Sequence, residues 1–275
     1  VFGFGRNFNA RGNQTINLDG AVTLGTLNIG DISGQQSYII GAGTGGTLTF
    51  NNGGTAAINK SGIATDVITS NIVLTNPVTI DVADGRLALT GVLSGAGGIT
   101  KNGNGTLVLR GVNTFTGVST LNGGITLIAP FADNGAVLGA SGVAQGTVVN
   151  SGATLAIAND QSAAAGLTGG GASNAEPLTI NGQGFRNQGA LRNMFGRETN
   201  QFTGVVTLGS ASRIQSDAGT LQLTGALNVN QDVMMGGSNF VQLSGAVSGS
   251  NTITHYGSNG FQLSNITAGQ TYSGT

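Results

Sequence analysis

The chain has 275 residues, a net charge of −1 and only 8% charged side chains, which excludes the basic surface that nucleic-acid binding requires. Glycine supplies 50 residues without a Gly-x-y period, which excludes collagen, and an apolar fraction of 39% argues against a disordered chain. Cysteine is absent, and no apolar run approaches the length of a membrane-spanning helix, so no membrane span is expected in this chain.

The N-terminal segment Val1-Phe2-Gly3-Phe4 is apolar and strand-like, and neither a start methionine nor a signal peptide precedes it. We therefore expect Val1 to be a processed or internal end. The segment could cap a stack of strands, continue a removed part of the stack, or pair with another subunit. Val1, Phe2 and Phe4 are accordingly candidate assembly contacts.

Short strand signals fill the rest of the chain. Apolar, β-branched and threonine residues alternate in short runs that end at Gly, Asn or Asp turns. Clear examples are 26–29, 47–50, 78–82, 124–127 and 153–157. No long segment has a persuasive helical period, so the pattern predicts an all-β protein.

One strand pattern, Leu-x-Leu-[Ser/Thr]-Gly, returns at a constant spacing. It occurs at 87–91 and 221–225, and related forms occur at 107–111, 241–245 and 261–265. A fixed period near 20 with alternating apolar residues is typical of stacked β-coils. We therefore predict a parallel β-solenoid of roughly ten or eleven coils, about 20 residues per coil and on the order of 50 Å long.

Two longer copies contain these repeats. Residues 72–91 align with 206–225 at a shift of 134, and residues 93–111 align with 247–265 at a shift of 154. The two shifts differ by the spacing of the short repeat. The simplest account is that the second copy gained one complete coil around Asn228–Val247, because such an insertion leaves the register of its neighbours intact.

The region between the copies is less regular. Residues 129–145 and 159–200 contain stretches rich in Ala, Gly, Asn and Ser, and they are expected to be loop excursions from the stack. The stretch 187–200, which carries Arg192, could form a short helix or a partner contact. No clear linker separates two halves, so residues 1–275 are expected to form a single continuous solenoid.

Residues 93–117 resemble the autotransporter-associated β-strand repeat, the passenger-associated transport repeat of large bacterial surface proteins. The matching motifs are Gly97-Gly98-Ile99-Thr100-Lys101, Gly105-Thr106-Leu107-Val108-Leu109 and Asn113-Thr114-Phe115-Thr116-Gly117. A weaker copy covers 247–275. The resemblance implies a right-handed β-solenoid that is secreted or displayed on the bacterial cell surface, often within a very long chain, and it implies no catalytic residues.

The weaker copy departs from the pattern at Asn259-Gly260-Phe261 and stops at Tyr272-Ser273-Gly274-Thr275, inside a pattern that ran on in the earlier copy. The chain is therefore expected to be a piece of a longer polypeptide. Tyr272 is the fourth candidate assembly contact.

His255 is the only histidine and the first candidate for a base or a ligand. The alignment of the copies places it opposite Lys101, and a position that accepts either residue is expected to be a solvated turn. Without a second histidine or any cysteine, no zinc site is expected. Nothing in the sequence fixes a Ser-His-Asp arrangement.

Two further motifs have a structural interpretation beside the chemical one. The segment 41–46 contains Gly-x-Gly-x-x-Gly, but a dinucleotide site requires a helix to follow, and a strand pattern follows instead, so a flexible turn is expected. Asp81 and Asp84 are the best carboxylate pair for polysaccharide cleavage. However, Asp84-Gly85 is also a turn signal, and Arg86 beside it could neutralise the charge. Only 11 acidic residues are present, too few for a calcium ladder.

Phenylalanine supplies 11 of the aromatic residues and mostly falls at strand positions. Phe50, Phe115 and Phe240 are expected to stack in the core. Phe131, like the two N-terminal phenylalanines, could join subunits or stack on sugars if it is exposed.

These features predict a structural, surface-exposed protein with no catalytic, cofactor-binding or metal-binding residues. Its expected partner is itself, end to end or laterally, in a fibre or coat, or it serves as a rigid adhesive stalk. The alternative is an adhesin module for host or matrix glycans, with 129–145 and 159–200 as its binding face. A polysaccharide-degrading β-helix enzyme is the less favoured third possibility.

Overall fold

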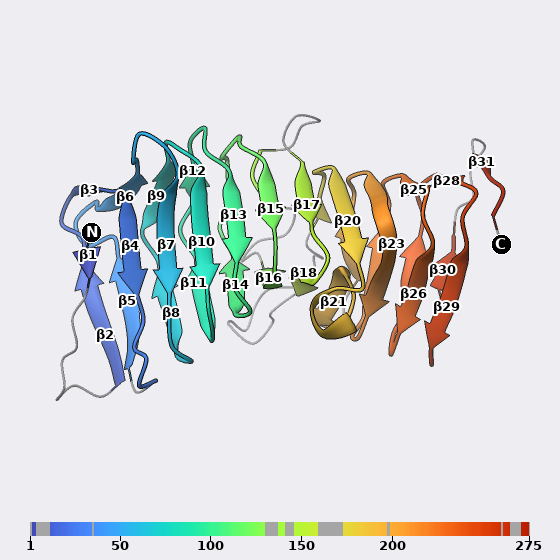
Figure 1. Ribbon diagram of the computed structural model, residues 1–275, viewed down its shortest axis with the longest axis horizontal. Coiled ribbons are helices and arrows are strands. Elements are labelled where there is room, and N and C mark those ends of the chain that lie inside the picture. Colours follow the sequence, from blue (N-terminus) through green and yellow to red (C-terminus); the bar gives the residue numbers. More distant parts are fainter. Residues whose placement is uncertain are drawn as a thin grey trace.

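The computed structural model describes residues 2–3, 12–34, 36–129, 137–140, 146–158, 173–196, 199–259, 261–264 and 271–274. The chain forms a parallel β-solenoid of about 10 turns with about 22 residues per turn (Figure 1). The strands stack along one long axis, and the two ends of the chain lie at opposite ends of the stack. The predicted all-β solenoid is confirmed, with turns slightly longer than the spacing of the short repeat.

Each turn passes through up to three strands, and equivalent strands of successive turns pair in parallel to form three faces. Face 1 consists of β1 (Phe2–Gly3), β4 (Thr26–Ile29), β7 (Ala56–Lys60), β10 (Val78–Val82), β13 (Ile99–Asn102), β15 (Ser119–Leu121), β17 (Thr147–Val149), β20 (Leu178–Gly182), the first part of β23 (Val206–Ser216), β25 (Leu227–Val229), β28 (Val247–Gly249) and β31 (Thr271–Tyr272).

The other two faces complete each turn. Face 2 consists of β2 (Gly12–Asn17), β5 (Gln36–Gly41), β8 (Thr65–Ile68), β11 (Arg86–Leu89), β14 (Thr106–Leu109), β16 (Gly124–Ile128), β18 (Ala153–Ala158), β21 (Leu191–Phe195), the last part of β23, β26 (Val233–Gly237) and β29 (Ile253–Gly257). Face 3 is two sheets, the first made of β3 (Ala21–Leu24), β6 (Thr47–Phe50), β9 (Asn71–Leu74) and β12 (Leu93–Ser94), the second of β19 (Ser173–Asn174), β22 (Thr199–Phe202), β24 (Thr220–Leu223), β27 (Val241–Leu243) and β30 (Phe261–Leu263).

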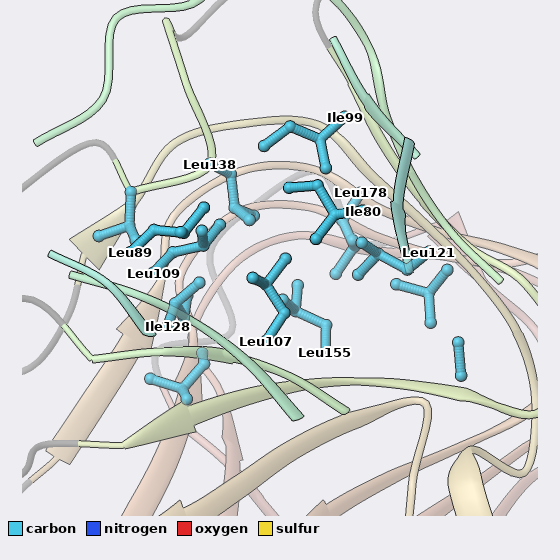
Figure 2. Close-up of a cluster of buried hydrophobic side chains, with 14 of the residues drawn as sticks. Ile80, Leu89, Ile99, Leu107, Leu109, Leu121, Ile128, Leu138, Leu155 and Leu178 are labelled. Carbon is cyan, nitrogen blue, oxygen red and sulfur yellow. The ribbon is translucent and has the colours of Figure 1, made fainter. Parts of the chain in front are cut away.

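The core is a column of apolar side chains inside the solenoid. Alternate residues of each strand point inward, and those of one turn stack on those of the next. Figure 2 shows Ile80, Ile99 and Leu121 of face 1 converging on side chains of face 2 such as Leu107 and Leu109. Full burial of one such side chain contributes about 1.5–3 kcal/mol, so this column supplies most of the driving force for folding.

The glycine of the Leu-x-Leu-[Ser/Thr]-Gly repeat has a steric reason. A Cβ atom on Gly91 would overlap the carbonyl oxygen of Ser70, and one on Gly225 would overlap that of Gly204. Likewise, a Cβ on Gly245 would overlap the carbonyl oxygen of Gly225. The repeat therefore ends on glycine because the corner after the strand lies directly against the backbone of the preceding turn.

The two long sequence copies lie on different faces. Leu87 lies in β11 on face 2, whereas its aligned residue Leu221 lies in β24 on face 3. Leu107, in β14 on face 2, is likewise aligned with Phe261, in β30 on face 3. The copies are thus displaced by one face, and the repeated unit of sequence is a strand with its corner, which fits any face of the solenoid.

The turn proposed as an insertion is a complete turn of the structure. Leu227 pairs with Val247, Val233 with Ile253, and Val241 with Phe261. On each of the three faces, paired residues of successive turns are therefore separated by 20 residues. The turn made of β25, β26 and β27 is therefore 20 residues long on every face, the spacing of the short repeat.

Deletion of residues 228–247 is expected to leave a folded solenoid, because Leu227 then takes the register position of Val247. Nearest-neighbour contacts elsewhere are unchanged, so thermal unfolding should remain cooperative with a small loss of stability. Circular dichroism and thermal denaturation measure this. Deletion of residues 228–237 is the control, since it removes half a turn and should abolish folding; equal behaviour of the two deletions would contradict the argument.

Other expectations about the chain are met only in part. Phe50 and Phe115 are fully buried as predicted, but Phe240 is 44% exposed, because it precedes the inward-pointing Val241 and so points outward. Phe131 lies outside the described residues. In the described residues no helix is long and apolar enough to cross a membrane.

The two predicted excursions are only partly described. In the first, residues 130–136 and 141–145 lie outside the described residues, and Val137 and Leu138 are buried in the core. In the second, residues 159–172 lie outside them, whereas β19, β20 and β21 belong to the stack. The solenoid therefore continues into the segment expected to leave it.

Candidate functional site

The outer side of face 1 carries two columns made mostly of small polar residues. Each strand presents two outward residues on either side of an inward one, as in Thr100-Lys101-Asn102 and Thr120-Leu121-Asn122. The first column is Thr26, Ala57, Thr79, Thr100, Thr120, Val148, Thr179, Thr207, Asn228 and Ser248. The second column is Asn28, Asn59, Asp81, Asn102, Asn122, Asn150 and Asn181. We call these two columns the face-1 array.

Hydrogen bonds connect neighbouring members of the second column. The Asn59 amide donates to Oδ1 of Asn28 over 2.8 Å, and the Asn122 amide donates to Oδ1 of Asn102 over 2.9 Å. The Asn150 amide donates to Oδ1 of Asn122 over 2.8 Å. Such amide ladders hold each side chain in one orientation, so the array is ordered before any partner arrives.

The first column is connected in the same way near the C-terminal end. The Asn228 amide donates to Oγ1 of Thr207 over 3.3 Å, and the Ser248 hydroxyl donates to Oδ1 of Asn228 over 3.0 Å. All members of the array are half-buried or exposed, and Asp81 is the only ionisable one. The array is therefore a solvent-facing and almost uncharged surface.

The outer side of face 2 differs from the face-1 array. Its central row is apolar and forms a second cluster with neighbouring side chains: Ala88, Val108, Leu127, Ala129, Ala156 and Ala158 are all buried. Every residue of β18 is buried, on the outer as well as the inner side of the strand. This part of face 2 is covered, whereas face 1 is open to solvent.

Near the C-terminal end, face 2 carries a polar cluster. The Arg192 side chain donates to Oδ2 of Asp217 over 2.5 Å, and its salt bridge is partly exposed. The Arg213 guanidinium lies 3.9 Å from the centroid of the Tyr256 ring, and the Tyr256 hydroxyl donates to Oε1 of Gln215 over 3.1 Å. Arg192, considered above as a partner contact, is therefore engaged within the chain.

The predicted assembly contacts lie at the two ends of face 1 as far as they are described. Phe2 in β1 pairs with Leu27, and Tyr272 in β31 pairs with Gly249. Val1 and Phe4 lie outside the described residues. The structure thus separates Phe2 and Tyr272 by the length of the solenoid, so they cannot form one site within a single chain.

The interior holds an ion pair that the sequence reasoning missed. Lys60 Nζ lies 3.3 Å from Asp66 Oδ2, and both side chains have 0% exposure. The Lys60 ammonium also donates to the carbonyl oxygens of Ser61 (2.7 Å) and Gly62 (2.6 Å). Asp66 Oδ1 accepts the backbone N–H of Tyr38 over 2.7 Å. Burial raises the pKa of Asp66, against the lowering effects of the Tyr38 N–H and of Lys60.

Lys101 is a second buried cation, so its predicted place in a solvated turn is wrong. Its Nζ donates to the carbonyl oxygens of Gly103 (2.7 Å), Gly105 (2.8 Å) and Gly123 (2.8 Å). Burial lowers the pKa of Lys101 to about 8, while Asp81 acts in the opposite direction. His255 lies on face 2, at the register position of the buried Met235, and it is exposed in the last described turn of that face. The sequence copies are displaced by one face, so the aligned positions of Lys101 and His255 are not equivalent in space.

Glu176 is a buried carboxyl group. Its Oε1 accepts a hydrogen bond from the Thr147 hydroxyl over 2.9 Å, and its exposure is 1%. Burial raises the pKa of Glu176 to about 8, and the bond from Thr147 lowers it. A signal for the two lysines was present in the sequence, since Lys60 and Lys101 occupy inward places in the alternation of β7 and β13. Glu176 precedes β20 and has no such signal.

The remaining candidate site residues from the sequence lie at the surface, either in corners between strands or in the face-1 array. Asp81 belongs to the face-1 array, and Asp84 is exposed in the corner before β11. The Gly41–Gly46 segment forms the end of β5 and a turn, followed by the strand β6, as its turn interpretation predicted. In the part of the chain that the structure describes, no three His, Cys, Asp or Glu residues form a group that could hold a metal ion.

Comparison of the chain with protein-family models, with characterised proteins and with solved structures found no match.

Proposed function

We propose that this chain is a structural β-solenoid segment of a secreted or surface-displayed bacterial protein, and that it associates end to end into a fibre or coat. The location outside the cell rests on the sequence resemblance of residues 93–117. The association rests on the strand edges at the two ends of the stack. The same rigid rod, with its continuous core, would also serve as an adhesive stalk.

Within the described residues, the outermost strands at both ends of the stack pair on one side only. At the N-terminal end β1, β2 and β3 pair on one side only, with β4, β5 and β6, as far as the described residues show. At the C-terminal end β31, β29 and β30 pair on one side only within the same described part, with β28, β26 and β27. Such edges are templates for pairing with another chain.

The geometry of the ends favours a head-to-tail contact. The strands of each face run parallel throughout, so the C-terminal edges of one copy meet the N-terminal edges of the next in the same direction. Two different surfaces then form the contact, and a contact of this kind that does not close into a ring builds an open filament.

Blocking one edge strand tests the proposal. Val233 N–H donates to Thr252 O, and Val233 pairs with Ile253, so the alternation of a parallel ladder directs the N–H of His255 away from β26. The variant His255→Pro removes this outward donor without removing a backbone bond to β26. It also removes the contact of His255 Nε2 with the carbonyl oxygen of Asn259, which any variant without the imidazole loses as well.

We expect His255→Pro to shorten or abolish filaments seen by negative-stain electron microscopy, with an unchanged circular dichroism spectrum. His255→Ala is the matched control, because it removes the same side chain and keeps the N–H, and it should assemble as the parent chain does. Equal assembly of the parent chain and His255→Pro would count against end-to-end pairing through face 2.

A further inference from the structure

We propose that the face-1 array pairs laterally with the face-1 array of a second copy of this chain. This inference rests on the proposed function of a self-associating structural protein, and it adds a side-to-side contact to the end-to-end one. The array is a built surface rather than a scatter of polar residues, because its amides are already bonded along the column.

The regular spacing of the side chains in the face-1 array indicates which kind of partner can bind it. Hydroxyl or amide groups return at most turns, at the strand spacing of about 4.8 Å; Ala57 and Val148 interrupt the first column, and the second column ends at Asn181. A single small molecule would contact only one or two of these groups. A partner gains from all of them together only if it repeats with the same spacing, since many weak contacts then add in one binding event. A second copy of this solenoid has that spacing by construction.

The chemistry of the array is self-complementary. Threonine hydroxyls and asparagine amides each donate and accept hydrogen bonds, so two identical surfaces can satisfy one another. Apart from Asp81 the array has no ionisable side chain, so bringing two copies together creates almost no charge repulsion. The threonine methyl groups add apolar area to the contact, and the same patch on both subunits makes a two-fold symmetric interface.

The size of face 1 suits such a contact. Ten strands from β4 to β28, spaced by about 4.8 Å, give a length of roughly 48 Å, and about four residues per strand give a width of roughly 13 Å. Two such surfaces bury on the order of 1,200 Å² in total, at the lower end of the range of specific protein interfaces. A weak dimer that becomes strong when many copies are joined end to end is therefore expected.

The other faces do not offer an equivalent surface over the whole length. The central outer row of face 2 is buried in its own cluster. Face 3 has a shorter polar column on its second sheet, where the Gln222 amide donates to Ser244 Oγ (2.9 Å) and the Gln242 amide to Ser264 Oγ (2.8 Å). This column supplies a matched control, because Gln222 pairs with Gln242 just as Thr100 pairs with Thr120.

The test is sedimentation velocity over a concentration series, performed in the His255→Pro background so that end-to-end growth is blocked. We expect the chain that carries only His255→Pro to dimerise as its concentration rises. The double variant Thr100→Lys/Thr120→Lys places two positive charges at the centre of the array, and it should weaken dimerisation at least tenfold. The double variant Gln222→Lys/Gln242→Lys adds the same charge to face 3 and should dimerise as before.

The outcomes separate this inference from the proposed function. If the face-1 variant still dimerises, or if both double variants lose the dimer equally, the lateral pairing through face 1 is wrong while filament formation by the unblocked chain is untouched. A chain that stays monomeric at all concentrations overturns the pairing. Binding of that monomer to insoluble polysaccharide or to ice, lost in Thr100→Lys/Thr120→Lys, would overturn it too and assign the array to that solid.

Discussion

Replacing Asp66 by alanine is expected to destabilise the solenoid by about 3–5 kcal/mol, because Lys60 then remains as a buried charge without its carboxylate. The backbone N–H of Tyr38 also loses its acceptor, Asp66 Oδ1. The two carbonyl bonds of Lys60 remain, but neutral oxygens compensate a buried ammonium less well than a carboxylate does. Urea unfolding followed by circular dichroism measures the loss, and amide hydrogen exchange in β7 and β8 locates it.

The double variant Lys60→Met/Asp66→Asn is the control for this prediction. It removes both charges, keeps an oxygen that can accept the Tyr38 N–H, and fills similar volume. We expect it to recover most of the lost stability, because replacing a whole buried ion pair is often neutral whereas breaking one is costly. A loss below about 1 kcal/mol for Asp66→Ala would show that the pair does not contribute as argued.

The variant Glu176→Gln is expected to change how stability depends on pH. The pKa of Glu176 is raised to about 8 in the folded chain, above its ordinary value of 4.5, because burial disfavours the charged form. A group with a raised folded pKa contributes stability that is fully present below the unfolded pKa and is lost as the pH rises through the folded pKa. The free energy of unfolding should therefore fall between about pH 5 and pH 8, by up to about 1.4 kcal/mol per pH unit.

Glutamine keeps the shape of the side chain and an oxygen that can accept the Thr147 hydroxyl, but it cannot ionise. Glu176→Gln should therefore remove this slope and be the more stable protein at pH 8. Chemical denaturation at a series of pH values below 8 measures the difference between parent and variant. In that range Lys101, whose pKa is lowered to about 8, remains largely protonated and adds little slope. Parallel pH profiles for the two chains would refute a buried, proton-binding Glu176.

The fold class and the approximate length of the turn could both be predicted from the sequence, because each has a local cause. The alternation of apolar residues defines strands with one inward side, and the glycine of the short repeat lies where the chain contacts the backbone of the preceding turn. A repeat of about 20 residues then requires stacking, since one such unit cannot bury its own apolar side. Most inward residues could be named from this alternation, including Leu107 and Leu109, which are both buried.

The face that each strand occupies could not be predicted in this way. The aligned residues Lys101 and His255 lie on different faces: Lys101 is buried in β13 on face 1, whereas His255 lies in the last described turn of face 2, at the register position of the buried Met235, and is exposed. Strands and corners have the same sequence pattern on all three faces, so the sequence of a strand does not indicate which face it occupies. The burial of Glu176 likewise depends on a contact with Thr147, which is distant along the chain.

The face-1 array also emerges only in three dimensions. The chain that separates Thr26 from Ala57 is longer than the chain that separates Thr100 from Thr120, since corners of different length lie between the strands. A single Thr-x-Asn triplet does not form an extended surface. The surface forms only when neighbouring turns place further such triplets beside it. Strand pairing supplies that placement, because the backbone ladder holds each turn in register whatever the length of the corner between them.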